Sequence, residues 1–70
     1  MKEYVTNNVF SLRKEKNITQ DEFAKILGVS RQTVVAIEKG NYIPSLLLGM
    51  KIAKFFNKKV EEVFNYKYEK

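Results

Sequence analysis

The stretch TQDEFAKILGVSRQTVVAIEKG (residues 19–40) decides the fold because it carries start and stop signals for two short helices. Thr19 and Glu22 form a capping-box pattern, and Gly28 supplies the positive φ at which such a helix ends. Ser30 begins a second helix, which another glycine ends ten residues later. Because the second cap comes only two residues after the first stop, the helices must cross steeply. The pattern predicts a helix-turn-helix unit over residues 19–40.

Apolar residues recur at helical spacing in both halves of this stretch. Phe23, Ala24 and Leu27 form one stripe, and Val34 with Ile37 forms the other. A helical hairpin without any ligand has the same spacing, since helix pairs with short turns are common in all-α folds. The spacing alone leaves a plain hairpin and a binding unit both open.

Length and composition narrow the class of protein. The 70 residues suit one small domain, and the hydrophobic fraction of 44% argues against disorder. The chain has no cysteine and no histidine, so we expect no metal site, no cofactor and no enzyme activity. No apolar run has transmembrane length, and the N-terminus lacks a signal core, which predicts a cytoplasmic protein without a membrane partner. The net charge of +5 favours nucleic acid as partner, although many small domains carry such charge for solubility alone.

The rest of the chain predicts three more helices, over about residues 8–16, 45–56 and 60–64. The first is expected to be capped by Asn7 or Asn8. The apolar residues of the second cover more than half of its circumference, which predicts burial by several neighbours, and Gly49 suggests a helix passing close to it. These apolar residues are Leu46, Leu48, Met50, Ile52, Ala53 and Phe56.

Two other features predict long-range contacts. Arg13 points near the core side of the first helix, and Glu38 is the obvious acidic partner if the helices meet; two unrelated surface charges are the alternative. Residues 3–6 and 64–68 are both β-prone, which predicts an antiparallel two-stranded ribbon joining the termini. Two frayed tails remain the alternative. Such a ribbon is marginal alone, so we expect it to lie on the core or at an interface.

Taken together, these residues resemble the Cro/C1-type helix-turn-helix family, also called the XRE family, over nearly the whole chain. The resemblance implies one compact all-α domain over residues 1–70, built from five helices. In the smallest stand-alone members a terminal β-ribbon sits beside the dimer interface. The residues that carry the resemblance are Ile18-Thr19-Gln20, Ala24 and Gly28, Val29-Ser30, Val34 and Ile37, Glu38-Lys39-Gly40, Pro44-Ser45-Leu46, and Lys51-Ile52-Ala53.

The resemblance also implies a function. Proteins of this kind bind double-stranded operator DNA sequence-specifically, usually as a homodimer on a palindrome, and act as transcriptional regulators, above all as repressors. No small-molecule ligand is evident. An antitoxin-like protein-interaction module that binds DNA only secondarily is the alternative, but the sequence lacks a long arm to wrap a partner. The residues implied in DNA binding are Thr19, Gln20, Ser30, Arg31, Gln32, Thr33, Val35, Ala36, Lys39 and Asn41.

The resemblance implies that the second helix of the unit lies in the major groove and reads the bases. At its leading end, Arg31 matches the two acceptors of guanine, and Gln32 matches the donor and acceptor of adenine. Thr33 can reach a phosphate or a base. Val35 and Ala36 depart from the polar residues that are common in the family, so they either contact thymine methyl groups or make no contact.

The resemblance also implies which residues contact the DNA backbone and which residues form the dimer. Gln20 opens the first helix of the unit and is expected to bind a phosphate, while Thr19, Lys39 and Asn41 match other backbone-contact positions. A solvated loop is the alternative for Lys39 and Asn41. The dimer contact is expected over about residues 55–68. The residues expected to form it are Val63, Phe64, Tyr66 and, less directly, Phe55.

Overall fold

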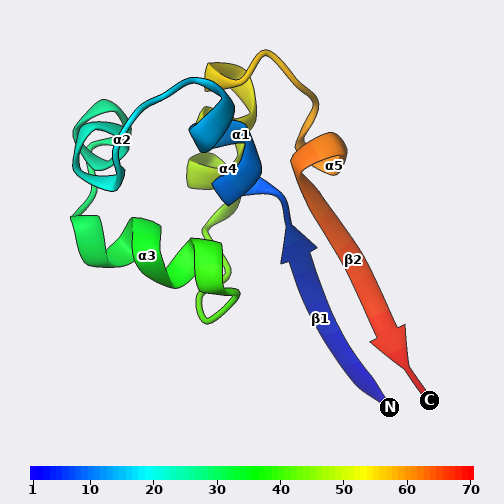
Figure 1. Ribbon diagram of the computed structural model, residues 1–70. Coiled ribbons are helices and arrows are strands. Elements are labelled where there is room, and N and C mark those ends of the chain that lie inside the picture. The colour runs from blue at the N-terminus through cyan, green and yellow to red at the C-terminus, as the bar shows by residue number, and fades with distance from the viewer.

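The two helices at residues 19–40 lie where the sequence predicts them. The computed structural model describes all 70 residues, with α2 at Gln20–Leu27 and α3 at Arg31–Lys39 (Figure 1). The Thr19 hydroxyl accepts the Glu22 N–H at 3.0 Å, and the Glu22 carboxylate accepts the Thr19 N–H at 2.8 Å. Gly28 ends α2 at φ 76°, in the left-handed region that glycine enters without strain. The capping box and the tight turn are confirmed.

The chain ends form the predicted antiparallel ribbon. Strand β1 (Lys2–Asn7) pairs with β2 (Phe64–Glu69) in a register that runs from Lys2 opposite Glu69 to Asn7 opposite Phe64. The ribbon projects from the helices and carries both termini at its free end (Figure 1). The compact five-helix arrangement with a terminal ribbon is confirmed, and the term all-α describes it only loosely because two six-residue strands are present.

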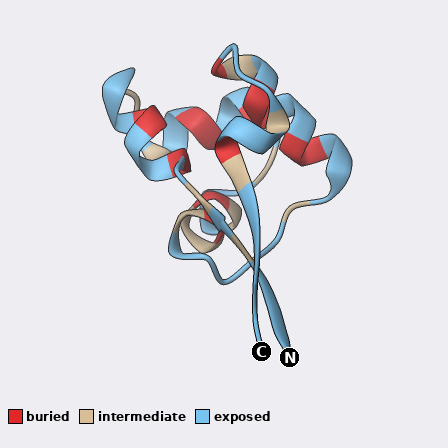
Figure 2. Ribbon diagram, turned by 90° about the vertical axis from the view of Figure 1, so that its right-hand side faces the viewer, coloured by how far each residue is buried: buried red, intermediate tan, exposed pale blue.

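The remaining helices are α1 (Val9–Glu15), α4 (Leu46–Phe55) and α5 (Val60–Val63). None of the helices is long and apolar enough to span a membrane. Buried residues gather among the helices and leave the ribbon largely exposed (Figure 2). The core consists of Val9, Leu12, Phe23, Ala24, Leu27, Val34, Ile37, Leu48, Ile52, Ala53, Phe56 and Val63.

The surroundings of α4 differ from the prediction. Leu46 is 75% exposed and Met50 is 53% exposed, so the expectation that both face the core is wrong. The helices that contact α4 most extensively are α2 and α5, and they leave the side of α4 that carries Leu46 and Met50 uncovered. At Gly49 the nearest group is the ring of Phe64, 3.8 Å from where a Cβ would lie, rather than a passing helix.

The expected dimer contact is corrected in part. Val63 is fully buried in the core, so its side chain cannot contact a second copy. Phe55 packs its ring against Phe23 and Phe56, with centroids 5.5 and 5.1 Å away. Tyr66, in contrast, is exposed on the ribbon.

Asn7 joins three elements at the base of the ribbon. Its Oδ1 accepts the Val9 N–H at 3.0 Å, which caps α1, and its Nδ2 donates to the Ile37 carbonyl of α3 at 3.0 Å. Of the two expected caps, Asn7 is therefore the one used, since the Asn8 side chain makes no cap hydrogen bond. Lys51 of α4 donates to the Leu27 carbonyl at 2.7 Å and closes the end of α2.

The predicted pair of Arg13 and Glu38 is present and buried. The Nε–Oε2 distance is 2.6 Å, the Nη2–Oε1 distance is 3.1 Å, and the two side chains are 7% and 4% exposed. Arg13 Nη1 also donates to the Ile18 carbonyl at 2.8 Å, and Gln20 Nε2 donates to Glu38 Oε1 at 3.1 Å. One charged cluster thus joins α1, α2 and α3.

Replacing Arg13 by methionine is expected to lower the free energy of unfolding by about 3–5 kcal/mol, because the Glu38 carboxylate is left buried without its partner. The double variant R13M/E38L should recover most of that loss, since neither charge remains. Urea denaturation at one fixed protein concentration measures both. The exposed pair of Arg31 and Asp21 serves as the control, and D21A should cost less than about 1 kcal/mol. Equal losses for R13M and D21A would contradict the role given to the buried pair.

Candidate nucleic-acid interface

The outer face of α3 presents a continuous set of polar and small side chains. Arg31, Gln32 and Lys39 are exposed, and Val35 and Ala36 are half-buried between them. The opposite face of the helix is fixed in the core, which leaves this face free. These five residues and Asn41 line one hollow of about 330 Å³. The structure therefore brings together six of the ten residues expected to bind DNA.

The start of α3 uses two more of the expected residues for a structural purpose. Ser30 Oγ accepts the Thr33 N–H at 3.2 Å and lies 3.0 Å from Thr33 Oγ1. The two hydroxyls thus partner each other at the helix cap, and neither residue lines a hollow. In this structure, Ser30 and Thr33 therefore cap the N-terminal end of α3.

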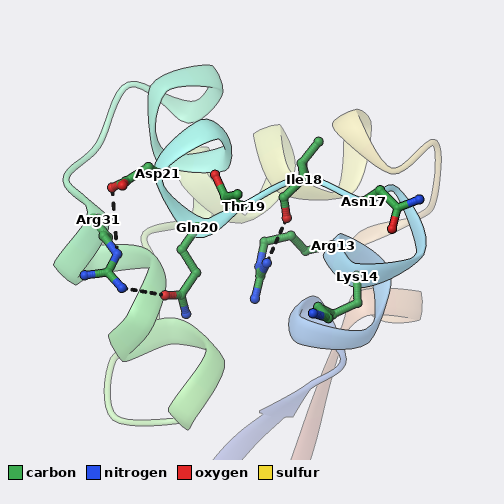
Figure 3. Close-up of a pocket in the computed structure, with 8 residues that line it drawn as sticks. All are labelled: Arg13, Lys14, Asn17, Ile18, Thr19, Gln20, Asp21 and Arg31. Carbon is green, nitrogen blue, oxygen red and sulfur yellow. Dashed lines mark hydrogen bonds and ion pairs between the residues drawn. The ribbon is translucent and has the colours of Figure 1, made fainter.

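A second hollow, of about 390 Å³, lies at the N-terminal end of α2 (Figure 3). It contains the two remaining expected residues, Thr19 and Gln20. Arg31 lines both hollows, so the two adjoin at this side chain. The other residues that line it are Arg13, Lys14, Asn17, Ile18 and Asp21.

Electrostatically, this second hollow is suited to an anion. The N-terminal end of α2 carries the partial positive charge of the helix dipole, Lys14 and Arg31 add two cations, and Asp21 adds one carboxylate beside Arg31. The charge of Arg13 is already balanced by Glu38. Arg31 lies between two acceptors, with Nε 3.7 Å from Asp21 Oδ1 and Nη2 3.4 Å from Gln20 Oε1 (Figure 3).

Sequence reasoning missed three residues of this hollow, namely Lys14, Asn17 and Asp21. Lys14 lies in the last turn of α1, and Asn17 follows it with φ 56°, so the chain turns sharply toward α2. Asparagine tolerates that left-handed backbone better than most residues, which was an available signal for the turn. The approach of Lys14 to the start of α2 is a tertiary feature, and no local pattern encodes it.

Comparison with known proteins agrees with this geometry. The model of the family described as helix-turn-helix matches residues 9–63. This chain belongs to the Cro/C1-type helix-turn-helix family. The match leaves out the whole ribbon, since β1 ends at Asn7 and β2 begins at Phe64.

Several relatives of this helix-turn-helix chain carry regulator names. An uncharacterised HTH-type transcriptional regulator of Methanocaldococcus jannaschii is 57% identical over 86% of this chain and 91% of its own length. The corresponding protein YgzD of Bacillus subtilis is 52% identical over 83% and 88%. The transcriptional repressor RstR of the cryptic phage CTXphi, from Vibrio cholerae, is 34% identical over 83% of this chain and 52% of its own length.

The capping box at the start of the helix-turn-helix unit gives the stability a pH dependence. The backbone N–H of Thr19, and then its hydroxyl, hold the pKa of the Glu22 carboxyl below its ordinary value of 4.5. Because folding lowers this pKa, the stabilisation is present above pH 4.5 and is lost as the pH falls through the lowered value.

Replacing Glu22 by glutamine is expected to flatten this part of the pH profile, because the amide keeps an acceptor oxygen but loses the titrating charge. Urea denaturation in steps below pH 5 down to about pH 3 measures the change in the free energy of unfolding. E15Q is the matched control, since Glu15 is exposed on α1 and outside any capping box. Identical profiles for E22Q and the unmodified chain would refute the assignment.

Proposed function

We propose that this chain is a sequence-specific DNA-binding transcriptional repressor that binds a palindromic operator as a homodimer. In this proposal α3 lies in the major groove of double-stranded DNA, with its N-terminal end leading. One observation carries it: five residues expected to contact DNA lie on the outer face of α3 and line one hollow together with Asn41, while the opposite face of the helix is held in the core.

The base-reading part of the proposal concerns the leading end of α3. Arg31 and Gln32 are both exposed there, so their side chains are free to approach base edges. An arginine can bind guanine through two hydrogen bonds and a glutamine can bind adenine in the same way. Val35 and Ala36 lie one turn further along and offer apolar contact to thymine methyl groups.

The backbone-binding part concerns the hollow at the start of α2. A phosphate there would meet the helix dipole of α2 and the cations of Lys14 and Arg31. Gln20 would contribute its side chain, which the hydrogen bond to Glu38 already orients. Lys39 and Asn41, at the other end of α3, would hold the second side of the groove. Such contacts fix the position of the protein on the duplex and carry little sequence information.

Repression and two-fold symmetry are supported by one relative and by the geometry of DNA. One relative is named as a phage transcriptional repressor, which favours repression over activation. In a symmetric dimer the two copies of α3 can enter successive major grooves about 34 Å apart, which requires a palindromic site.

Replacing Arg31 by alanine is expected to relax specificity at one base pair, with a loss of discrimination of about 1–3 kcal/mol. Replacing Lys39 by alanine should instead weaken binding to all sequences alike and lower the salt dependence by about one phosphate contact. Mobility-shift titrations on the chain's own promoter region, at two salt concentrations and against single-base variants, separate these effects.

K58A is the matched control for these titrations, because Lys58 lies in the connection between α4 and α5, outside both hollows. It should leave binding unchanged. Binding with a steep salt dependence but no preferred site, unaffected by R31A, would reject sequence-specific reading.

A further inference from the structure

We propose that Asp21 is a positioning residue that sets the base specificity of Arg31. The Asp21 carboxylate holds one edge of the Arg31 guanidinium, so that this edge is closed to phosphate and the other edge is free to meet a base. Because Arg31 needs a base to read, this role rests on the proposed function. The contacts between the two side chains are present in the single chain.

Arg31 is the only residue that lines both the hollow at the start of α2 and the hollow on α3. Its guanidinium therefore has two targets within reach when DNA is bound, namely a phosphate at the start of α2 and a base edge over α3. A phosphate is the same in every sequence, whereas a base edge differs from one sequence to another. The target that Arg31 binds therefore decides whether it contributes to specificity.

The protein occupies one edge of this guanidinium and leaves the other edge free. Nε of Arg31 lies 3.7 Å from Asp21 Oδ1, and Nη2 donates to Gln20 Oε1 at 3.4 Å, while Nη1 has no hydrogen-bond partner in the protein (Figure 3). An arginine carries five N–H donors in a fixed planar fork, so the pair on Nη1 and Nη2 that points away from the stem stays available. Two parallel donors are what the O6 and N7 acceptors of guanine require.

Asp21 is the only acidic residue that lines the hollow at the start of α2. A carboxylate beside a phosphate repels it, so Asp21 lowers the affinity of this hollow for every DNA sequence. The helix dipole favours an acid in the first turn of α2, but Glu22 already supplies one there through the capping box. The one ion pair that Asp21 makes is with Arg31. The effect of this carboxylate on DNA binding therefore acts through Arg31.

The main consequence of this ion pair concerns DNA sites that carry the wrong base. When Arg31 faces a base pair other than its own, an unrestrained guanidinium turns to a nearby phosphate and recovers part of the lost binding. Asp21 and Gln20 occupy the edge that faces the hollow at the start of α2, so this alternative is closed and the wrong site keeps its full loss. Specificity is a difference of two affinities, so weakening the wrong complex raises it.

The buried ion pair supports this arrangement from below. Gln20 Nε2 donates to Glu38 Oε1 at 3.1 Å, and the Glu38 side chain is only 4% exposed in its pair with Arg13. A group that orients another side chain must itself be fixed, and Gln20 meets this condition. Asp21 adds the charge that Gln20 lacks. The side chains of Asp21 and Arg31 are 70% and 60% exposed in the free chain, and bound DNA would exclude water from them, which strengthens their attraction.

The variant D21N tests this role. It keeps the shape of the side chain and removes the charge, and because the ion pair is exposed the fold should persist, which far-UV circular dichroism checks. Mobility-shift titrations compare the duplex that the unmodified chain enriches from random DNA with the single-base variants of that duplex. At the base pair where R31A relaxes specificity, D21N should lower the ratio of dissociation constants by about 3- to 5-fold, the size expected for an exposed ion pair. Discrimination at the other base pairs should stay unchanged.

Three further variants complete the experiment. D21E keeps the carboxylate and should keep the discrimination of the unmodified chain. E15Q is the matched control, because it removes one negative charge from the exposed surface of α1, and Glu15 lines neither hollow. It should leave discrimination unchanged at every base pair. The double variant R31A/D21N should discriminate no worse than R31A alone, since Asp21 acts through Arg31.

Three results would overturn this role of Asp21. Equal strengthening of all sequences by D21N would identify a general effect of charge, and equal losses in D21E and D21N would exclude the ion pair. A further loss of discrimination when D21N is added to R31A would mean that Asp21 contacts DNA itself.

The titrations also separate this inference from the proposed function. If R31A relaxes one base pair and D21N does not, the positioning role of Asp21 fails and base reading by Arg31 stands. If R31A relaxes no base pair, base reading by Arg31 fails and the role of Asp21 fails with it.

Discussion

The buried pair of Arg13 and Glu38 is the interaction on which the rest of the structure depends. Two charges removed from water are tolerated only when their hydrogen-bonding groups are satisfied, and this pair meets the condition through Ile18 and Gln20. No buried side-chain nitrogen or oxygen in the protein lacks a partner. The cluster therefore fixes how α1, α2 and α3 meet, in a way that apolar contacts alone would leave less well determined.

This cluster also connects the interior to the proposed DNA-binding surface. Gln20 donates to Glu38 on one side and lies beside Arg31 on the other. The exposed Arg31 is thus linked to the buried ion pair through Gln20. The hollow at the start of α2 adjoins the hollow on α3 at this same Arg31 side chain. A binding surface placed on rigid elements positions its side chains better than one on loops, which is the advantage this arrangement gives to α3.

Local signals in the sequence predicted much of this fold, and non-local contacts explain most of what they missed. Caps and glycine stops act within a few residues, so Thr19 and Gly28 identify their helix ends reliably. The burial of α4 depends on which elements cover it, and an exposed Leu46 looks the same in sequence as a buried one. Pairing of the two chain ends likewise requires partners about sixty residues apart, which is why frayed tails remained an alternative. Lys14 was missed for the same reason.

The central claim is that α3 carries exposed side chains that read base edges from a rigid frame. Selection of bound sequences from a pool of random DNA duplexes tests it most directly. The account predicts an enriched two-fold motif whose half-sites are centred about one helical turn apart, with defined bases facing Arg31 and Gln32. A bound pool with no enriched motif, even at high salt where non-specific binding is weak, would contradict it.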